Sequence, residues 1–113
     1  MPLVTVSHKP GYSQHLLDAM RRELPDIVSR ALACDEEPYD GSLGRGDVVV
    51  RSSPDLAPDD VLDMVVEIQT TYYESRAGDL PERAADVRRG LEKLGLANFG
   101  VWVALPAASW SQD

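Results

Sequence analysis

The order in which the hydrophobic periodicity changes is the feature that most constrains the fold of this chain. Residues 3–8 alternate with a period of two, which predicts a strand with Val4 and Val6 on one face. Apolar residues then recur every three or four positions from Leu16 to Leu32, as they do along one side of a long helix. A short apolar run over residues 47–52 predicts a second, buried strand. The first half therefore has the order strand, helix, strand.

The second half of the chain repeats this order. Residues 62–69 alternate clearly and predict a third strand, and residues 79–95 predict a second amphipathic helix that ends at Gly95. Residues 99–105 predict the last strand. A chain of 113 residues that is 43% hydrophobic can fill one core, so we expect a single domain made of two β-α-β halves, about residues 1–60 and 61–113.

The handedness of β-α-β connections predicts how these elements assemble. If each half makes the usual right-handed crossover, the four strands form one sheet with both helices on the same face. The opposite face carries Thr5, Glu67 and Gln69, a set too mixed in polarity for a purely solvated surface. We therefore expect neighbouring subunits to cover that face. A ferredoxin-like α+β module has the same element order, and in that alternative the two middle strands pair directly.

Several residues predict local features of the helices and loops. Ser13 is placed to cap the first helix, and Asp79 begins a run with the spacing of a capping box. Pro25 lies inside the first helix, where proline costs ~3 kcal/mol, and we expect a kink at residues 21–24 because the apolar stripe continues in phase. The polar, glycine-rich residues 34–46 predict a mobile loop.

The charge and composition of the chain limit its partners. A net charge of −8 repels nucleic acid and anionic membranes, so neither is expected as a partner. The single cysteine, Cys34, excludes an intrachain disulfide, and no apolar run is long enough to span a membrane. We expect a cytoplasmic protein, in which an anionic substrate must be met by local arginines.

Pro2 follows the initiator methionine and opens the first predicted strand. Once Met1 is removed, Pro2 carries a secondary amine, and burial lowers the pKa of an amine. Such an amine can act as a general base near neutral pH. With Met1 retained, the same nitrogen is an amide with no lone pair to offer. Pro2 is therefore the candidate catalytic residue, on condition that Met1 is removed.

Pro2 after the methionine, the repeated β-α-β order and residues 11–32 together resemble the tautomerase superfamily. The first helix is similar to that of the 4-oxalocrotonate tautomerase group. The chain length is closer to the macrophage migration inhibitory factor and malonate semialdehyde decarboxylase groups, and residues 107–110 are similar to the tails of those longer members.

The resemblance implies an α+β fold with a four-stranded mixed sheet and two helices on one face. It also implies a homotrimer whose sheets enclose a central barrel, with an amino-terminal proline in a pocket between subunits. The resemblance implies small enol, 2-oxo-acid or haloacrylate substrates, and it implies neither a metal nor an organic cofactor. Tyr12 stands where the 4-oxalocrotonate group has a substrate-binding arginine.

Five further residues are candidates for substrate binding. Arg51 ends the second predicted strand and Arg76 lies in the predicted loop after the third, and arginine suits the recognition of a carboxylate. The aromatic candidates that orient a substrate or exclude water are Tyr12, Tyr72 and Trp110. The alternatives are surface or intersubunit ion pairs for the arginines and subunit-interface contacts for the aromatic residues.

Two functional hypotheses remain open from the sequence. The first is a keto-enol tautomerase, an isomerase that uses Pro2 as base and acid. The second is a non-catalytic trimer of the same fold that acts as a binding or interaction module, which the unusual loop at residues 34–46 and the missing arginine at position 12 favour. His8 and His15 flank a turn without a third ligand at a suitable spacing, so no metal site is expected. Trp102 is expected in the core or at an interface.

Overall fold

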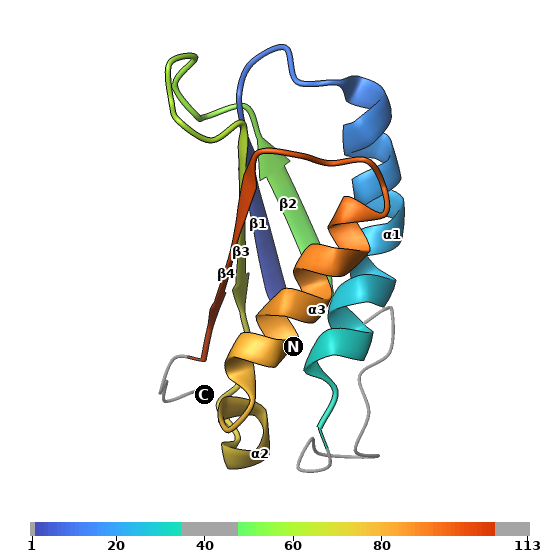
Figure 1. The fold of residues 1–113 in the computed structure, drawn as a ribbon, viewed down its shortest axis with the longest axis vertical. Coiled ribbons are helices and arrows are strands. Elements are labelled where there is room, and N and C mark those ends of the chain that lie inside the picture. The colour runs from blue at the N-terminus through green and yellow to red at the C-terminus, as the bar shows by residue number, and fades with distance from the viewer. Residues whose placement is uncertain (1, 35–47, 106–113) are drawn as a thin grey trace, which may run out of the picture.

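The computed structural model describes residues 2–34 and 48–105 of the chain (Figure 1). Its elements follow the predicted order, with one short helix added between the third strand and the second long helix. They are β1 (Leu3–His8), α1 (Gln14–Leu32), β2 (Val49–Ser53), β3 (Met64–Gln69), α2 (Glu74–Ala77), α3 (Leu80–Glu92) and β4 (Phe99–Ala104). Most of the loop expected at 34–46 and the tail from residue 106 lie outside the described residues.

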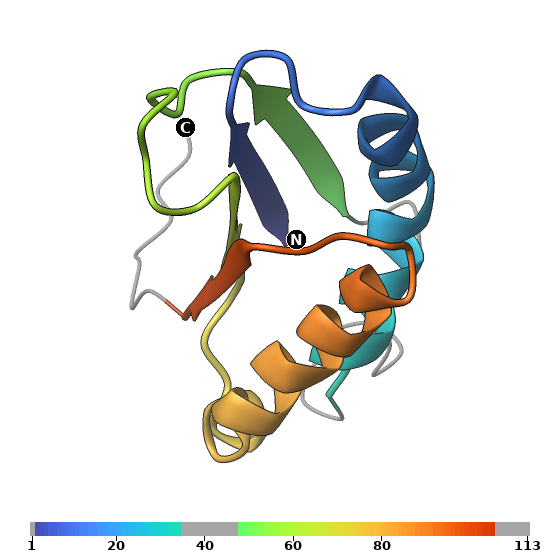
Figure 2. The ribbon, with the colours of Figure 1, turned by 45° about the horizontal axis from the view of Figure 1, so that its top comes forward.

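The four strands form one mixed sheet in the order β2-β1-β3-β4. β1 is parallel to β2 and antiparallel to β3, and β3 is parallel to β4. The helices α1 and α3 pack on one face of this sheet (Figures 1 and 2). The predicted α+β fold is therefore confirmed. The ferredoxin-like alternative is wrong, because β2 and β3 do not pair with each other but flank β1.

The core lies between the sheet and the two long helices. Alternate residues of the two central strands are fully buried, and both helices present apolar side chains to them. Apart from partly buried residues at its margin, this core consists of Val4, Val6, Leu17, Met20, Leu24, Ile27, Val28, Ala31, Leu32, Val48, Met64, Val66, Ile68, Val87, Leu91, Leu96 and Phe99.

The long helix α1 begins and continues as the sequence predicts. The hydroxyl of Ser13 accepts a hydrogen bond from the backbone nitrogen of Leu16 at 3.3 Å, and one continuous helix passes through Pro25. Gly95, with φ of 97°, follows the end of α3 in a conformation that favours glycine. Among the described residues, no helix is both long enough and apolar enough to cross a membrane.

Three local predictions are wrong. β2 is not buried, because it is an edge strand and all five of its residues are partly or fully exposed. The third strand starts at Met64 rather than Leu62. Asp79 makes no capping hydrogen bond, because its carboxylate accepts a hydrogen bond from Nε of Arg83 at 2.6 Å instead.

The face of the sheet without helices is here called the open face. Strand alternation and the pairing register place on it Leu3, Thr5, Ser7, Val49, Arg51, Ser53, Val65, Glu67, Gln69, Gly100, Trp102 and Ala104. Trp102 is 65% exposed and borders a hollow of about 340 Å³ with Val65 and Glu67. Trp102 therefore lies outside the core, on a face that suits contact with another chain.

Candidate functional site

Pro2 is buried at the amino end of β1. Its carbonyl oxygen accepts a hydrogen bond from the backbone nitrogen of Val49 at 3.1 Å, which attaches the start of the chain to β2. The nitrogen of Pro2 takes no part in the hydrogen bonds of the sheet, because a proline nitrogen within the chain has no hydrogen to donate. Burial and this hydrogen bond together fix Pro2 at the start of β1.

The pairing register shows which other segments reach the end of the sheet at Pro2. Leu3 pairs with Gln69, and Gln69 pairs with Ala104, so the starts of β1 and β2 meet the ends of β3 and β4. The backbone nitrogen of Thr70 donates to the carbonyl of Ala104 at 3.3 Å and extends the pairing of β3 with β4 by one residue. We call this end, where β1 and β2 start and β3 and β4 finish, the Pro2 end of the sheet. Tyr72, half exposed, follows β3 just beyond it.

Arg51 lies on the open face, in register with Thr5 of β1. Thr5 is three residues beyond Pro2, which corresponds to about 10 Å along the strand. Arg51 is exposed, and no hydrogen bond or ion pair joins its guanidinium to another of the described residues. Among the described residues, its guanidinium is thus an exposed and unpaired cation on the open face.

Arg76 occupies a different environment from the one predicted. It lies in α2 rather than in a loop, and it is fully buried. Its Nε donates to the carbonyl of Leu32 at 2.9 Å, and its Nη1 donates to the carbonyl of Thr71 at 2.8 Å and the hydroxyl of Thr70 at 3.3 Å. Its guanidinium also lies 5.3 Å from the ring centre of Tyr73. This environment favours a structural role over substrate binding.

Arg83 makes a second contact of this kind, which the sequence did not reveal. Its Nη1 donates to the carbonyls of Ala31 at 3.1 Å and Ala33 at 2.7 Å. The last carbonyls of a helix have no partners within the helix, so Arg83 and Arg76 together satisfy the carboxyl end of α1. Both arginines follow Leu32 by more than forty positions, and no local pattern marks such a contact.

Tyr12 lies at the opposite end of the sheet from Pro2. Its backbone nitrogen donates to the carbonyl of Lys9 at 3.2 Å, in the turn after β1. The six residues of β1 separate this turn from Pro2 by about 20 Å. The structure therefore does not bring Tyr12 and Pro2 of one chain together, and only the Pro2 of another copy can lie close to Tyr12.

Charged and aromatic groups surround Tyr12. Its ring centre is 6.1 Å from that of His8, and Asp63 forms an ion pair with Lys9 at 3.1 Å nearby. Partial burial, and secondly the negative charge of Asp63, raise the pKa of the Tyr12 phenol above 10.0. Hydrogen bonds from Lys9 and Asn98 lower the pKa of Asp63. Tyr12 is therefore a neutral hydrogen-bond donor at physiological pH.

The remaining site predictions are resolved only in part. Trp110 lies outside the described residues. Within residues 2–34 and 48–105, no three histidine, cysteine or acidic side chains gather closely enough to hold a metal ion. Nδ1 of His8 lies 3.0 Å from the carbonyl oxygen of Lys9, so this contact involves one of the two ring nitrogens of His8.

Comparison with known structures identifies the fold. No protein-family model and no curated protein sequence matches the chain. A 5-carboxymethyl-2-hydroxymuconate delta-isomerase superposes with a TM-score of 0.63 at 15% identity, covering 100% of this chain and 87% of its own. This chain has the tautomerase-superfamily fold.

Two further structures support this assignment of the fold. A macrophage migration inhibitory factor-like protein from Entamoeba histolytica superposes with a TM-score of 0.61 at 11% identity, covering 99% of this chain and 95% of its own. A fused 4-OT described as a symmetric trimer gives a TM-score of 0.62 at 13% identity, covering 92% of this chain and 85% of its own. The tautomerase fold thus extends over nearly the whole chain.

Proposed function

We propose that this protein is a tautomerase-superfamily enzyme that uses Pro2, after removal of Met1, as general base and acid on a small enol or 2-oxo acid. The observation that carries this proposal is the position of Pro2. It is buried at the end of the sheet and held through its carbonyl by Val49, which leaves its nitrogen outside the backbone hydrogen bonds. Burial disfavours the protonated amine and so favours a base that works near neutral pH.

The proposed reaction is a 1,3-transfer of one proton. The free amine of Pro2 takes the proton from the carbon next to the substrate's carbonyl, and the electron pair of that C–H bond moves to give an enolate. The protonated amine then returns a proton to the oxygen or to a different carbon. Atoms and charge balance in this transfer without a co-reactant.

Arg51 is the proposed partner of the substrate's carboxylate. Its exposed guanidinium lies about 10 Å along the strands from Pro2, a distance that a small substrate and the long arginine side chain span together. Tyr72 follows the Pro2 end of the sheet and is proposed to donate a hydrogen bond to the developing oxyanion. Trp110 is proposed to close the pocket against water.

The site is proposed to be shared between copies of the chain in a homotrimer. Tyr12 lies a full strand length from Pro2 of its own chain, so it contributes only to the site of a neighbour. The open face, on which Trp102 of the edge strand β4 is exposed, is the surface that neighbouring sheets would cover. The fused 4-OT of the same fold is described as a symmetric trimer, which supports this arrangement.

Mass and activity measurements test the catalytic proposal. We expect the intact mass of the purified protein to lack one methionine, and we expect ketonisation of phenylpyruvate or 2-hydroxymuconate. Pro2→Ala should lower kcat/KM by at least about a hundredfold, the usual contribution of a general base. Arg21→Gln, which removes a cation far from Pro2, serves as the control and should keep the wild-type rate. Equal rates for Pro2→Ala and wild type would reject the mechanism.

A substitution on the open face tests the trimer separately. Trp102→Glu places a charge on the surface that the neighbouring copies are proposed to cover, and burying an unpaired charge is costly. We expect the wild type to sediment as a trimer and Trp102→Glu to sediment as a smaller species with the same circular dichroism. A monomeric wild type would refute the shared site.

A non-catalytic binding module is the second candidate, and the position of Arg76 favours it. Arg76, one of the two arginines predicted to bind substrate, is buried and hydrogen-bonded inside the protein. In addition, Tyr12 stands at the position of the substrate-binding arginine that the resemblance to the 4-oxalocrotonate group implies. Retention of Met1 on the purified protein, together with an intact trimer, would favour this candidate over the enzyme.

A further inference from the structure

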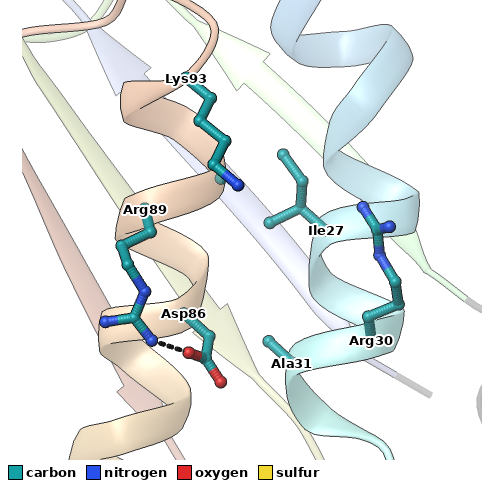
Figure 3. Close-up of a pocket in the computed structure, with 7 residues that line it drawn as sticks. Ile27, Arg30, Ala31, Asp86, Arg89 and Lys93 are labelled. Atoms are coloured by element: carbon teal, nitrogen blue, oxygen red, sulfur yellow. Dashed lines mark hydrogen bonds and ion pairs between the residues drawn. The ribbon is translucent and has the colours of Figure 1, made fainter.

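The outer surface of the helical layer contains a groove between α1 and α3, with a volume of about 300 Å³ (Figure 3). Its apolar floor is made by Ile27 and Ala31 of α1 and by Gly90 of α3. A side chain at position 90 would place its Cβ 2.9 Å from Cγ2 of Ile27, so glycine allows the two helices to approach here. The groove is therefore a consequence of close helix packing.

Positively charged side chains form the walls of this groove. Arg30 belongs to α1, Arg89 belongs to α3, and Lys93 directly follows the last residue of α3. Arg30 and Lys93 lie on either side of Ile27, and the ammonium group of Lys93 points toward α1 (Figure 3). No hydrogen bond or ion pair engages this ammonium group within the described part of the chain. A cation of α1 and a cation at the end of α3 thus face one apolar floor.

The charge of the groove is opposite to that of the whole chain. Its lining holds three cations and one carboxylate, Asp86, which is already paired with Arg89. The chain as a whole has a net charge of −8. Such a local excess of positive charge attracts a small anion even though the net charge of the chain is negative. The apolar floor adds a place for the organic part of a ligand.

We propose that the groove between α1 and α3 binds a small organic anion, with an anionic head between Lys93 and Arg30 and an apolar body on Ile27 and Ala31. A volume of about 300 Å³ is at the lower end for small-molecule sites. The groove lies on the helical side of the sheet, away from the open face, so a trimer that covers the open face leaves it accessible. This site does not depend on Pro2 or on the proposed reaction.

Titration with phenyl phosphate, followed by amide NMR at low ionic strength, tests this proposal. We expect saturable shifts confined to residues 27–31 in α1 and to residues 86–93 at the end of α3. Lys93→Gln and Arg30→Gln should each weaken binding roughly tenfold, because each removes a hydrogen bond to a charged group. Phenylacetate in a parallel titration distinguishes a phosphate from a carboxylate head, and binding of either supports the site.

Matched controls separate a built site from general electrostatic attraction. Arg21→Gln removes the same charge from the same helix outside the groove, and Pro2→Ala alters the other proposed site, so both should bind phenyl phosphate as the wild type does. Equal weakening by Arg21→Gln and Arg30→Gln would overturn the proposal, as would shifts that do not saturate. Inorganic phosphate binding as tightly as phenyl phosphate would overturn the assignment of an organic ligand.

Discussion

The Nε of Arg76 lies 2.9 Å from the carbonyl oxygen of Leu32, the last residue of α1. This contact joins α2 to the end of a helix from the other half of the chain. Arg83 adds hydrogen bonds to the carbonyls on either side of Leu32. Two arginines of the second half therefore take the place of a glycine cap at the end of α1 and connect the two halves near the Pro2 end of the sheet.

Arg76→Met should lower the free energy of unfolding by about 3 kcal/mol. The substitution keeps much of the side-chain volume but leaves the carbonyls of Leu32 and Thr71 and the hydroxyl of Thr70 without this partner. A buried polar group without a partner costs about 1–3 kcal/mol. Urea denaturation at one fixed protein concentration measures the difference, since oligomers gain stability with concentration.

Arg21→Met is the matched control for this change. Arg21 donates to the hydroxyl of Ser52 in an exposed position, so its loss should cost less than about 1 kcal/mol. If Arg76→Met is as stable as Arg21→Met, the buried arginine is not required for the fold. Its role in binding substrate would then have to be tested by kinetics.

Gly90→Ala should destabilise the protein by about 1 kcal/mol, although alanine is the better helix former. The added methyl would lie 2.9 Å from Cγ2 of Ile27, whose branched side chain has little freedom to move. In an Ile27→Ala background the methyl fills vacated space, so the same substitution should raise stability by about 1 kcal/mol. Thermal unfolding of the four proteins measures this coupling.

Gly78→Ala provides the comparison for Gly90→Ala. A Cβ at position 78 would meet only the carbonyl of Glu74, at 3.4 Å, which is nearly an ordinary contact. Its effect on stability should stay within a few tenths of a kcal/mol. Additive effects of the substitutions at positions 27 and 90 would show that the helices separate to admit the methyl, and would remove the packing argument.

The sequence predicts the elements of the fold where the apolar pattern is local and uninterrupted. The bounds of β1 agree with the prediction, and α1 continues through Pro25 as the phase of its apolar stripe indicates. The burial of β2 is predicted wrongly because burial depends on the number of neighbouring strands, and β2 has only β1 beside it. Asp79 fails to cap α3 because Arg83, one turn later, binds its carboxylate.

The sequence predicts the candidate site less well than the fold. The place of Pro2 at the start of β1 is predicted correctly, because it depends only on the next residues of the chain. Arg76 is misplaced because the acceptor that fixes it, Leu32, is 44 residues away, and nothing near Arg76 in sequence reveals the contact. Tyr12 is separated from Pro2 by the length of β1. The residue type at position 12 therefore does not reveal whether Tyr12 serves the site of its own chain or that of a neighbour.

Tyr12 should ionise above its ordinary pKa of 10.0, and its titration should affect stability in alkali. The raised pKa favours the neutral phenol in the folded state. Its contribution to stability is therefore complete below pH 10 and is lost as the pH rises through the folded-state pKa. Absorbance titration of wild type against Tyr12→Phe measures the pKa, and urea denaturation at pH 9 and 11 measures the loss, which Tyr12→Phe should lack.

Asp63→Asn tests the causes of this shift. Burial is the larger cause and the charge of Asp63 the smaller, so removing that charge should lower the pKa of Tyr12 without returning it to 10.0. The substitution also breaks the ion pair with Lys9, for which Lys9→Gln is the control. A full return of the pKa to 10.0 in Asp63→Asn would mean that burial does not hold the phenol neutral.

Mixing two defective variants tests whether Pro2 and Tyr12 from different chains form one site. If Tyr12 binds substrate, Pro2→Ala and Tyr12→Ala should each lose most activity as pure proteins. In trimers reassembled from an equal mixture, about one site in four would combine an intact Pro2 with an intact Tyr12 from its neighbour.

We therefore expect the mixture to recover about a quarter of the wild-type activity, measured as ketonisation of phenylpyruvate after unfolding and joint refolding. The separation of Tyr12 from its own Pro2 by the length of β1 is the reason for this expectation. If both residues served one site within a chain, every chain in the mixture would carry one defect and no activity would return. Variants refolded separately and then combined without exchange provide the baseline, and a mixture that stays at this baseline would refute the shared site.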